Sequence, residues 1–405
     1  MNRIFNKQYG YYLPAFLYIS IDEDIDFNDF ESNSNEVKGT FMHEYCHYLQ
    51  DVSTTYGYLN FINGFQNYLS NINGDDSETE RILYRNYRFG NLYRGDDEIE
   101  GYKGCLTSIN KICFKEDKYI KAKYPDEDCR YVAVTCNGSM EFKFGNYCIM
   151  ESMAYLVEKR LYGTGETIDD FPYKVCEMIC KKEYAEFAQK EIYVMALCEL
   201  ALLEVTGAKF FIDALRMMKE KKFIPQSVFE MEEFVDKHFK IGFRGDKKRI
   251  LELLQEVYLD GIVDFEHIRE WIVSRYSIGC EYREKSKCFI SLVLSAEEKE
   301  RFDLWNRMMK DFGCPNVINK DGHLSSGAYL NNEEVDIGYM LAPMAINNLL
   351  NATRDKIQPC ALAEICKAFT TKSSYDELCE SNPRKKADEQ WLCPLGVFLN
   401  LYHLE

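Results

Sequence analysis

Apolar side chains recur every three to four residues through most of the second half of this 405-residue chain. That period matches one face of an α-helix and predicts amphipathic or buried helices. We expect helices over residues 150–163, 173–206, 208–222, 227–240, 246–258, 262–277, 296–312, 335–352 and 360–370. Residues 313–334 contain Gly and Asn without such a period and are predicted to form a loop.

Strand-like stretches occur in the first half of the chain. Residues 11–21 are predicted to form a strand. Residues 131–136 and 140–144 alternate or run apolar, and the Asn137-Gly138 pair between them is a strong hairpin signal. The pattern therefore predicts an α+β fold that is predominantly helical, with a small mixed or antiparallel sheet and a helical C-terminal half.

One helix of the first half has an unusual distribution of side chains. Asn33 followed by Glu36 resembles a capping box, Gly57 is a plausible stop, and residues 58–72 suggest a second helix. At 100° per residue, one face carries Phe41, Tyr45, Tyr48 and Val52, and the opposite face carries His43, His47, Gln50 and Thr54. We expect a mostly buried helix, packed against the small sheet, whose polar stripe lines a functional site.

The polar stripe contains the pentapeptide His43-Glu44-Tyr45-Cys46-His47, an H-E-x-x-H motif in a chain with six histidines. Two histidines four residues apart on a helix point the same way and can bind one zinc ion. The glutamate beside the first histidine can then act as the general base of a hydrolysis. The motif predicts His43 and His47 as ligands of one catalytic Zn²⁺ and Glu44 as the catalytic residue.

A catalytic zinc ion needs a third protein ligand. The continuation H-x-x-G-x-x-H is absent, because Gln50 and Ser53 stand where Gly and His would be. The remaining histidines are in contexts that do not suggest metal binding: His238, His267, His323 and His403. A carboxylate is therefore expected.

Glu151 is the preferred third ligand. It begins a helical stripe formed by Glu151, Tyr155, Glu158 and Tyr162. Ala154 beside this stripe would let a second helix approach closely. Glu78 and Glu80 lie nearer to His47 in the sequence and remain alternatives, as does a ligand outside this set.

The His43–His47 motif with a glutamate on a later helix resembles the gluzincin-like zinc metallopeptidases. The resemblance covers about thirty residues. The chain departs from the thermolysin-like pattern, since about a hundred residues separate His47 from Glu151 and the N-E-x-x-S-D context is missing. The resemblance implies a zincin fold and hydrolysis of a peptide bond. It also implies that a strand of the 131–144 hairpin could bind substrate as a sheet edge, although a plain hairpin explains the pattern equally well.

Further site residues follow from this assignment. A donor that assists the zinc ion in the transition state is often a tyrosine, and Tyr155 and Tyr147 are candidates by position, although packing also explains each of them. Asp51, one turn beyond His47, and Glu158 are candidate acceptors for the ring N–H groups of the ligand histidines.

The charge of the chain narrows the choice of partners. The formal net charge is −17, and residues 1–100 hold 7 Lys and Arg against 17 Asp and Glu. Nucleic acid is therefore not an expected partner of the zinc-motif region, and a basic protein or peptide segment is a more natural substrate, although a solvated acidic surface also explains the charge. The longest apolar helical stretch, residues 192–205, is interrupted by Glu199 and Glu204 and is too short to span a bilayer. The oligomeric state is not predicted.

Sixteen cysteines are present without a regular disulfide framework. No apolar segment follows the basic start of the chain, so a cytoplasmic location is expected. Two groups of cysteines could in principle act as metal ligands. Cys176 and Cys180 have no paired ligands after them, and the C-terminal group lacks a C-x2-C knuckle: Cys360, Cys366, Cys379, Cys393 and His403. Ordinary thiols are expected in both.

Two domains are predicted. Residues 1–222 would form a zincin-like metallopeptidase domain, with a polar insertion or lid at about 73–104. Residues 246–405 would form a helical domain of unknown role. The lysine-rich and glycine-containing stretch between them, residues 222–246, marks the boundary.

Three functions are compatible with the sequence. The first is an intracellular zinc-dependent endopeptidase acting on a protein, as in some bacterial regulatory, toxin or phage-defence systems. The second is a non-peptidase zinc amidohydrolase or esterase that uses the same site. The third is a regulatory interaction protein with a structural or inactive zinc site. A closed zinc site with four protein ligands would indicate the third.

Overall fold

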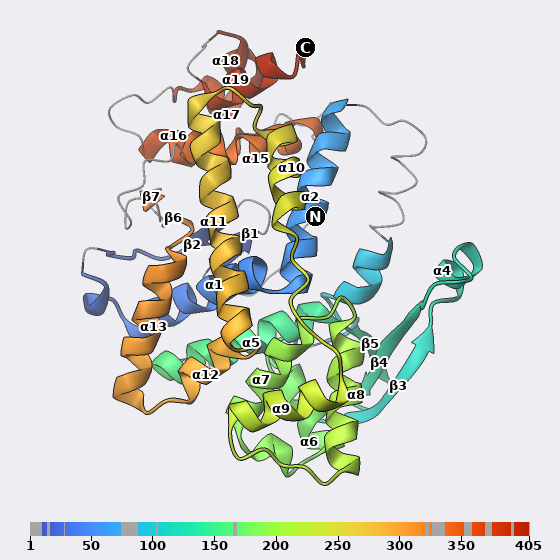
Figure 1. Cartoon of the computed structure of the whole chain (residues 1–405). Coiled ribbons are helices and arrows are strands. Elements are labelled where there is room, and N and C mark those ends of the chain that lie inside the picture. Colours follow the sequence, from blue (N-terminus) through green and yellow to red (C-terminus); the bar gives the residue numbers. More distant parts are fainter. Residues whose placement is uncertain are drawn as a thin grey trace.

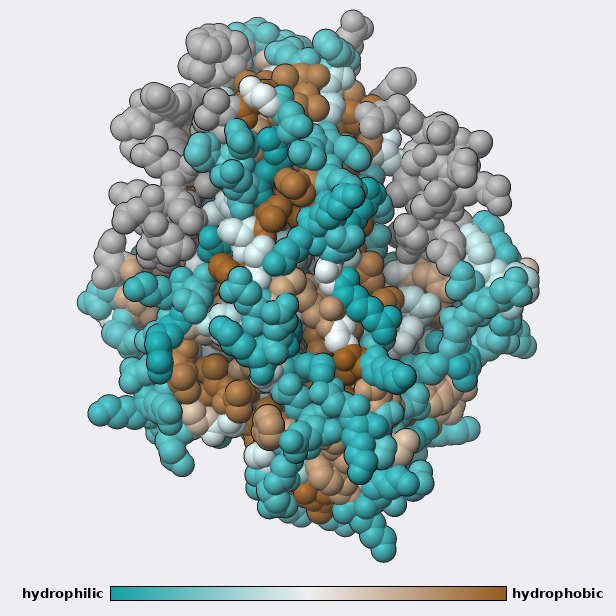
Figure 2. All heavy atoms as spheres, in the orientation of Figure 1, coloured by the Kyte–Doolittle hydropathy of each residue, from teal (hydrophilic) through white to brown (hydrophobic). Residues whose placement is uncertain are grey.

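The computed structural model describes residues 10–13, 17–27, 29–73, 88–102, 104–164, 168–320, 324–325, 337–351, 359–368, 375–389 and 393–404. Its helices and strands form an α+β fold that is predominantly helical, which confirms the predicted class. In Figure 1 the helices α6 to α9 gather at one end of the molecule and α16 to α19 at the other, with α1 and α5 between them. On the face drawn in Figure 2 hydrophilic side chains predominate, in keeping with the net charge of −17.

Helices account for most of the described chain. The helices of the first half are α1 (Asn35–Ser53), α2 (Thr55–Asn73), α4 (Lys118–Lys123), α5 (Asn146–Tyr162), α6 (Val175–Glu183) and α7 (Glu191–Ala201). Those of the second half are α8 (Gly207–Glu220), α9 (Val228–His238), α10 (Lys247–Val257), α11 (Val263–Lys285), α12 (Phe289–Ser295), α13 (Glu298–Phe312), α15 (Ile337–Asn351), α16 (Ala363–Ala368), α17 (Leu378–Ser381), α18 (Pro383–Glu389) and α19 (Pro394–Leu401). The helix expected over 173–206 is divided into α6 and α7 by a short 3₁₀ turn at Phe187–Gln189.

The strands form two separate sheets. They are β1 (Gly10–Leu13), β2 (Tyr18–Ile21), β3 (Ile109–Glu116), β4 (Arg130–Cys136), β5 (Met140–Phe144), β6 (Asn316–Ile318) and β7 (Leu324–Ser325). One sheet has the order β1-β2-β6-β7, in which β2 and β6 run parallel and the other pairs antiparallel. The other is the antiparallel sheet β3-β4-β5. The sheet that packs on α1 is the first, through β1 and β2.

Two strand predictions need correction. The predicted strand over 11–21 is instead two strands, β1 and β2, which pair antiparallel, and β6 and β7 lie within the predicted loop over 313–334. The predicted hairpin turn is confirmed. Asn137 and Gly138 both have positive φ angles, 47° and 90°, as the tight two-residue turn between β4 and β5 requires.

The ends of α1 differ from the predicted ones. Ser34, not Asn33, is the N-cap, and its side chain accepts a hydrogen bond from Val37 N. The helix ends at Ser53, because Thr54 is extended, and Gly57 lies inside α2. A Cβ atom at Gly57 would lie 2.3 Å from the Cα of Asp51. Gly57 is therefore needed for the close corner between α1 and α2 rather than for helix termination.

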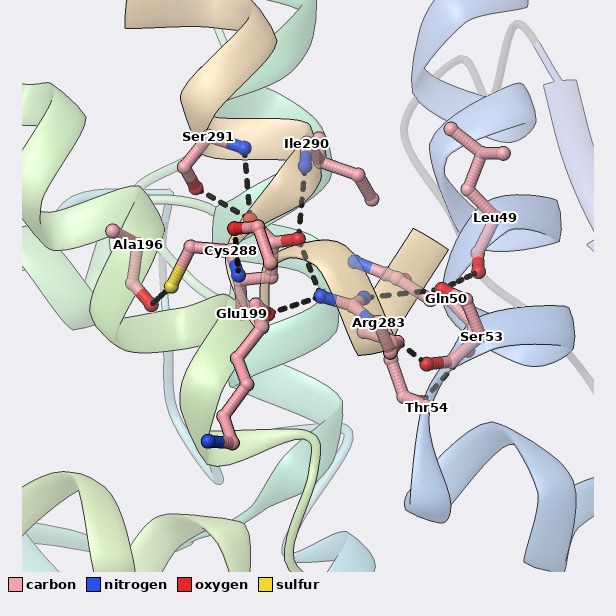
Figure 3. Close-up of polar contacts among 12 residues, drawn as sticks. Leu49, Gln50, Ser53, Thr54, Ala196, Glu199, Arg283, Cys288, Ile290 and Ser291 are labelled. Atoms are coloured by element: carbon pink, nitrogen blue, oxygen red, sulfur yellow. Dashed lines mark hydrogen bonds and ion pairs between the residues drawn. The ribbon is translucent and has the colours of Figure 1, made fainter. Parts of the chain in front are cut away.

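A buried ion pair fixes the C-terminal end of α1 (Figure 3). Arg283 of α11 donates to the carbonyl of Ser53 at 2.8 Å and to Glu199 Oε1 of α7 at 2.6 Å. Glu199 also accepts hydrogen bonds from Ile290 N and from the backbone and hydroxyl of Ser291. These contacts join α1 to three helices. One hydrophobic core runs from Leu17 to Leu399, and the division of the chain at 222–246 stays a prediction.

Candidate metal centre

Helices α1 and α5 pack against each other and bring His43, His47 and Glu151 together. Glu151 Oε2 lies 3.2 Å from His43 Nε2 and 3.5 Å from His47 Nε2. Within the described residues, this is the group of three or more metal-competent side chains whose ligand atoms all lie within 4.8 Å of one another. The three residues are thus arranged as a possible metal site.

The donor distances fit a tetrahedral ion. Zinc–nitrogen and zinc–oxygen bonds of about 2.0–2.1 Å in a tetrahedron place neighbouring donor atoms about 3.3 Å apart. The two distances to Glu151 Oε2, 3.2 and 3.5 Å, lie on either side of that value. Three protein donors would leave one position of the tetrahedron for water.

The other ring nitrogen of each histidine also has a partner. His43 Nδ1 lies 3.3 Å from Glu158 Oε2, one of the two acceptors expected from the sequence. His47 Nδ1 lies 2.8 Å from Gln50 Oε1, and Gln50 Nε2 donates to the carbonyl of Met150 at 3.1 Å. If each Nδ1 carries the proton, each Nε2 has a lone pair directed toward Glu151, as a metal ligand requires.

Asp51 does not take the role expected for it. Its carboxylate is buried and has no hydrogen-bond partner within the described part of the chain. The Tyr12 hydroxyl approaches it without hydrogen-bond geometry and is itself without a partner there. Burial raises the pKa of Asp51 to about 8, partly opposed by Tyr12 and His47. The acceptor for the ring N–H of His47 is therefore Gln50. The sequence places Gln50 on the same helix face as His47 but gives it no role.

The electrostatics of the three residues are strongly coupled. Burial opposes protonation of both histidines, but Glu151 raises the pKa of each above its ordinary value. Burial would raise the pKa of Glu151, yet the two imidazoles lower it well below its ordinary range. A proton and a metal ion therefore compete for the same ring nitrogens, which Glu151 makes easier to protonate, so metal binding should strengthen as the pH rises.

Glu44 follows His43 on α1 and lies beside the metal-competent group. It is buried, and its charge interacts with both histidines and with Glu151 and Glu158. Burial raises the pKa of Glu44, while the two histidines oppose that shift. Strand β1 runs directly beside it, since a Cβ atom at Gly10 would lie 3.2 Å from Glu44 Cγ. A carboxylate with a raised pKa suits a group that accepts and returns a proton.

Of the tyrosines near α5, Tyr155 is close enough to Glu158 for their charges to interact. It is buried, and Lys159 lies over its ring at 5.8 Å. Tyr173, which the sequence did not suggest, has its ring 5.7 Å from that of His43. Burial and the charge of Glu151 raise the pKa of Tyr173 and of Tyr147, so both keep their hydroxyl protons. Tyr173 follows α5 in a turn, and no periodic pattern marks it.

The alternative ligands are less well supported. Glu78 and Glu80 lie outside the described residues, as do His323 and much of the predicted lid. His267 and His403 are exposed, and the ring of His238 packs 4.5 Å from that of Phe234. Cys176 and Cys180 are buried thiols of α6.

Comparison with protein-family models, with curated proteins and with solved structures found no match for this chain. None of the helices in the described ranges is both long enough and apolar enough to cross a lipid bilayer. The assignment of a function therefore rests on the geometry of His43, Glu44, His47 and Glu151.

Proposed function

We propose that this chain is a zinc-dependent endopeptidase that hydrolyses a peptide bond in a protein substrate. The observation that carries the proposal is the convergence of His43, His47 and Glu151, at distances that suit one tetrahedral ion, beside the carboxylate of Glu44. Two helices separated by about a hundred residues of sequence supply these groups. A chance pair of histidines on one helix would not require this arrangement.

Each residue of the site has a separate role in the proposed reaction. His43, His47 and Glu151 would hold the zinc ion, which would supply a water of lowered pKa and would polarise the scissile carbonyl. Glu44 accepts the proton of the attacking water and passes it to the leaving amine. Tyr173, protonated and close to His43, is the best candidate to donate a hydrogen bond to the developing oxyanion.

The position of β1 supports a peptide substrate. Among the described strands, β1 is at the edge of its sheet, and it passes beside Glu44 and stacks Tyr12 on His47, with ring centroids 6.5 Å apart. An extended peptide can pair with such an edge through main-chain hydrogen bonds. The 131–144 hairpin is a less suitable edge for a substrate strand. The backbone N–H and carbonyl of Lys143 in β5 are already hydrogen-bonded to Asp96. The acidic net charge favours a basic segment.

Replacement of the general base separates catalysis from metal binding. We expect Glu44→Gln to keep one zinc ion bound by His43, His47 and Glu151. Its turnover rate should fall by at least about 100-fold. Glu36→Gln, an exposed glutamate of the same helix, is the matched control and should retain activity. The substrate can be found by comparing the proteomes of cells that express the parent and Glu44→Gln proteins. If Glu44→Gln cleaves that substrate as fast as the parent, the catalytic assignment is wrong.

A further inference from the structure

The contacts between α1 and α5 follow a regular order along the two helices. In the last turn of α1, Gln50 donates to the carbonyl of Met150 in the first half of α5. Two turns earlier on α1, His43 Nδ1 lies 3.3 Å from Glu158 Oε2 in the second half of α5. The two helices are therefore antiparallel, and the residue one turn before His43 is placed to meet the end of α5.

That residue is Gly39, the one glycine of α1. A Cβ atom at Gly39 would lie 3.1 Å from Glu158 Cγ and 3.2 Å from Glu158 Oε1. The same Cβ atom would lie 2.2 Å from the hydroxyl oxygen of Thr164, which follows the end of α5. Alanine is the better residue for a helix interior, so the helix itself gives no reason for a glycine at this position. The space left by the missing side chain is taken by Glu158 and Thr164.

We infer that Gly39 is a positioning residue of the metal site, because its missing side chain lets Glu158 reach the ring of His43. This inference rests on the metal site of the proposed function. A carboxylate that accepts the Nδ1 proton of a ligand histidine orients the ring, fixes its tautomer and leaves Nε2 for the ion. Gly39 acts on the site through Glu158, and it holds open the path by which that carboxylate approaches His43.

A methyl group at Gly39 would displace side chains rather than backbone. Apart from the backbone of α1, the three nearest atoms all belong to the side chains of Glu158 and Thr164. The Thr164 hydroxyl has no hydrogen-bond partner among the described residues, so turning it away breaks no bond there. Glu158 has less freedom, because it is 8% exposed and two of its atoms lie within 3.2 Å of the added carbon. The variant should therefore fold, with the carboxylate of Glu158 moved away from His43.

The zinc affinity of the full chain tests the inference, measured by titration against a colorimetric chelator. We expect Gly39→Ala to weaken zinc binding by about 10-fold. Loss of an outer partner of a ligand histidine typically costs about 10- to 100-fold, and here Glu158 is displaced rather than removed. Gly90→Ala is the matched control, because Gly90 is also helical and a Cβ atom there would have no neighbour within 4 Å. Gly90→Ala should bind zinc as tightly as the parent.

A double-mutant cycle separates positioning of Glu158 from a general disturbance of the helix pair. Glu158→Ala removes the carboxylate, so adding Gly39→Ala to it should cause no further loss of zinc affinity. Thr164→Ala, added to Gly39→Ala, removes the closest contact and helps the variant to fold, but it leaves Glu158 displaced. The loss of about 10-fold should therefore remain in that pair.

Three results would overturn the inference. They are parent-like zinc affinity in Gly39→Ala, an equal loss whether or not the Glu158 carboxylate is present, and full recovery of affinity when Thr164→Ala is added. Each of these leaves the proposed function intact if the parent binds zinc and hydrolyses its substrate. A parent that binds no zinc through His43, His47 and Glu151 would instead refute both proposals, so the two failures are distinguishable.

Discussion

At the scale of single residues, the two histidines of the motif are held in different ways. His43 is oriented by the carboxylate of Glu158, and His47 by the amide of Gln50, which is fixed in turn by the carbonyl of Met150. The sequence could predict His43, Glu44 and His47 because their spacing is local to one helix. It placed Gln50 on the same helix face but could not assign its hydrogen bond to His47, which depends on side-chain rotamers. It could not identify Tyr173, because that contact depends on how distant segments pack.

The amide of Gln50 is expected to position His47 for metal binding. Gln50→Ala removes the acceptor at Nδ1, so the ring loses its orientation, and zinc affinity should fall by about 10- to 100-fold. Affinity is measured by competition with a chromophoric chelator. Gln189→Ala, at an exposed glutamine of the 3₁₀ turn after α6, is the control. Equal affinities of the parent and Gln50→Ala would show that Gln50 has no such role.

The buried carboxyl of Asp51 predicts an unusual pH dependence of stability. Its pKa is about 8 in the folded protein against an ordinary 3.8, so between these values the folded state holds a proton that the unfolded chain releases. The free energy of unfolding should therefore fall as the pH rises from about 4 to about 8. Each unit by which the folded pKa exceeds the unfolded one contributes up to about 1.4 kcal/mol to that fall.

Asp51→Asn tests this dependence because the amide stays neutral. In chelator-treated protein, the variant should lack the part of the slope due to Asp51 and should be more stable than the parent at pH 8. Chemical denaturation at a series of pH values measures both quantities. Parallel curves for the parent and Asp51→Asn would refute the assignment.

At the scale of helices and strands, periodicity located most helices because their apolar faces repeat within the element itself. Strand β6 was missed, since its three residues are too few to show alternation and it pairs in parallel with β2, about 300 residues earlier in the chain. The break at Phe187–Gln189 was missed because buried Tyr184, Phe187 and Ala188 continue the helical spacing of apolar residues across it. Non-local pairing and an apolar period that continues across a break are the features that a single sequence does not reveal.

The ion pair between Arg283 and Glu199 should matter more to stability than exposed pairs do. Arg283→Ala leaves the carboxylate of Glu199 buried without its charge partner and removes the contact with Ser53, so a loss of about 3–5 kcal/mol is expected. Arg244→Ala is the comparison, because Arg244 pairs with Glu204 while 59% exposed, and should cost less than about 1 kcal/mol. Denaturant midpoints give both values, and similar losses in the two variants would contradict this view of α1.

At the scale of the whole molecule, the helix that carries the motif lies where the N-terminal and C-terminal halves meet. Helix α1 packs on α2, α5 and α11 as well as on β1 and β2, so both halves of the chain surround the motif. The sequence predicts a metallopeptidase domain and a separate helical domain; the largest hydrophobic core contains residues of both, and the boundary at 222–246 stays a prediction. The C-terminal half therefore has a structural reason to be present: it completes the burial of the motif helix.

The most direct test of the account is a crystal structure of the zinc-loaded protein with anomalous diffraction data collected at the zinc edge. We predict an anomalous peak about 2.0–2.2 Å from His43 Nε2, His47 Nε2 and one oxygen of Glu151, with a water molecule at the fourth position next to Glu44. An absence of anomalous density between these side chains in protein that contains zinc, or imidazoles turned away from Glu151, would contradict the account.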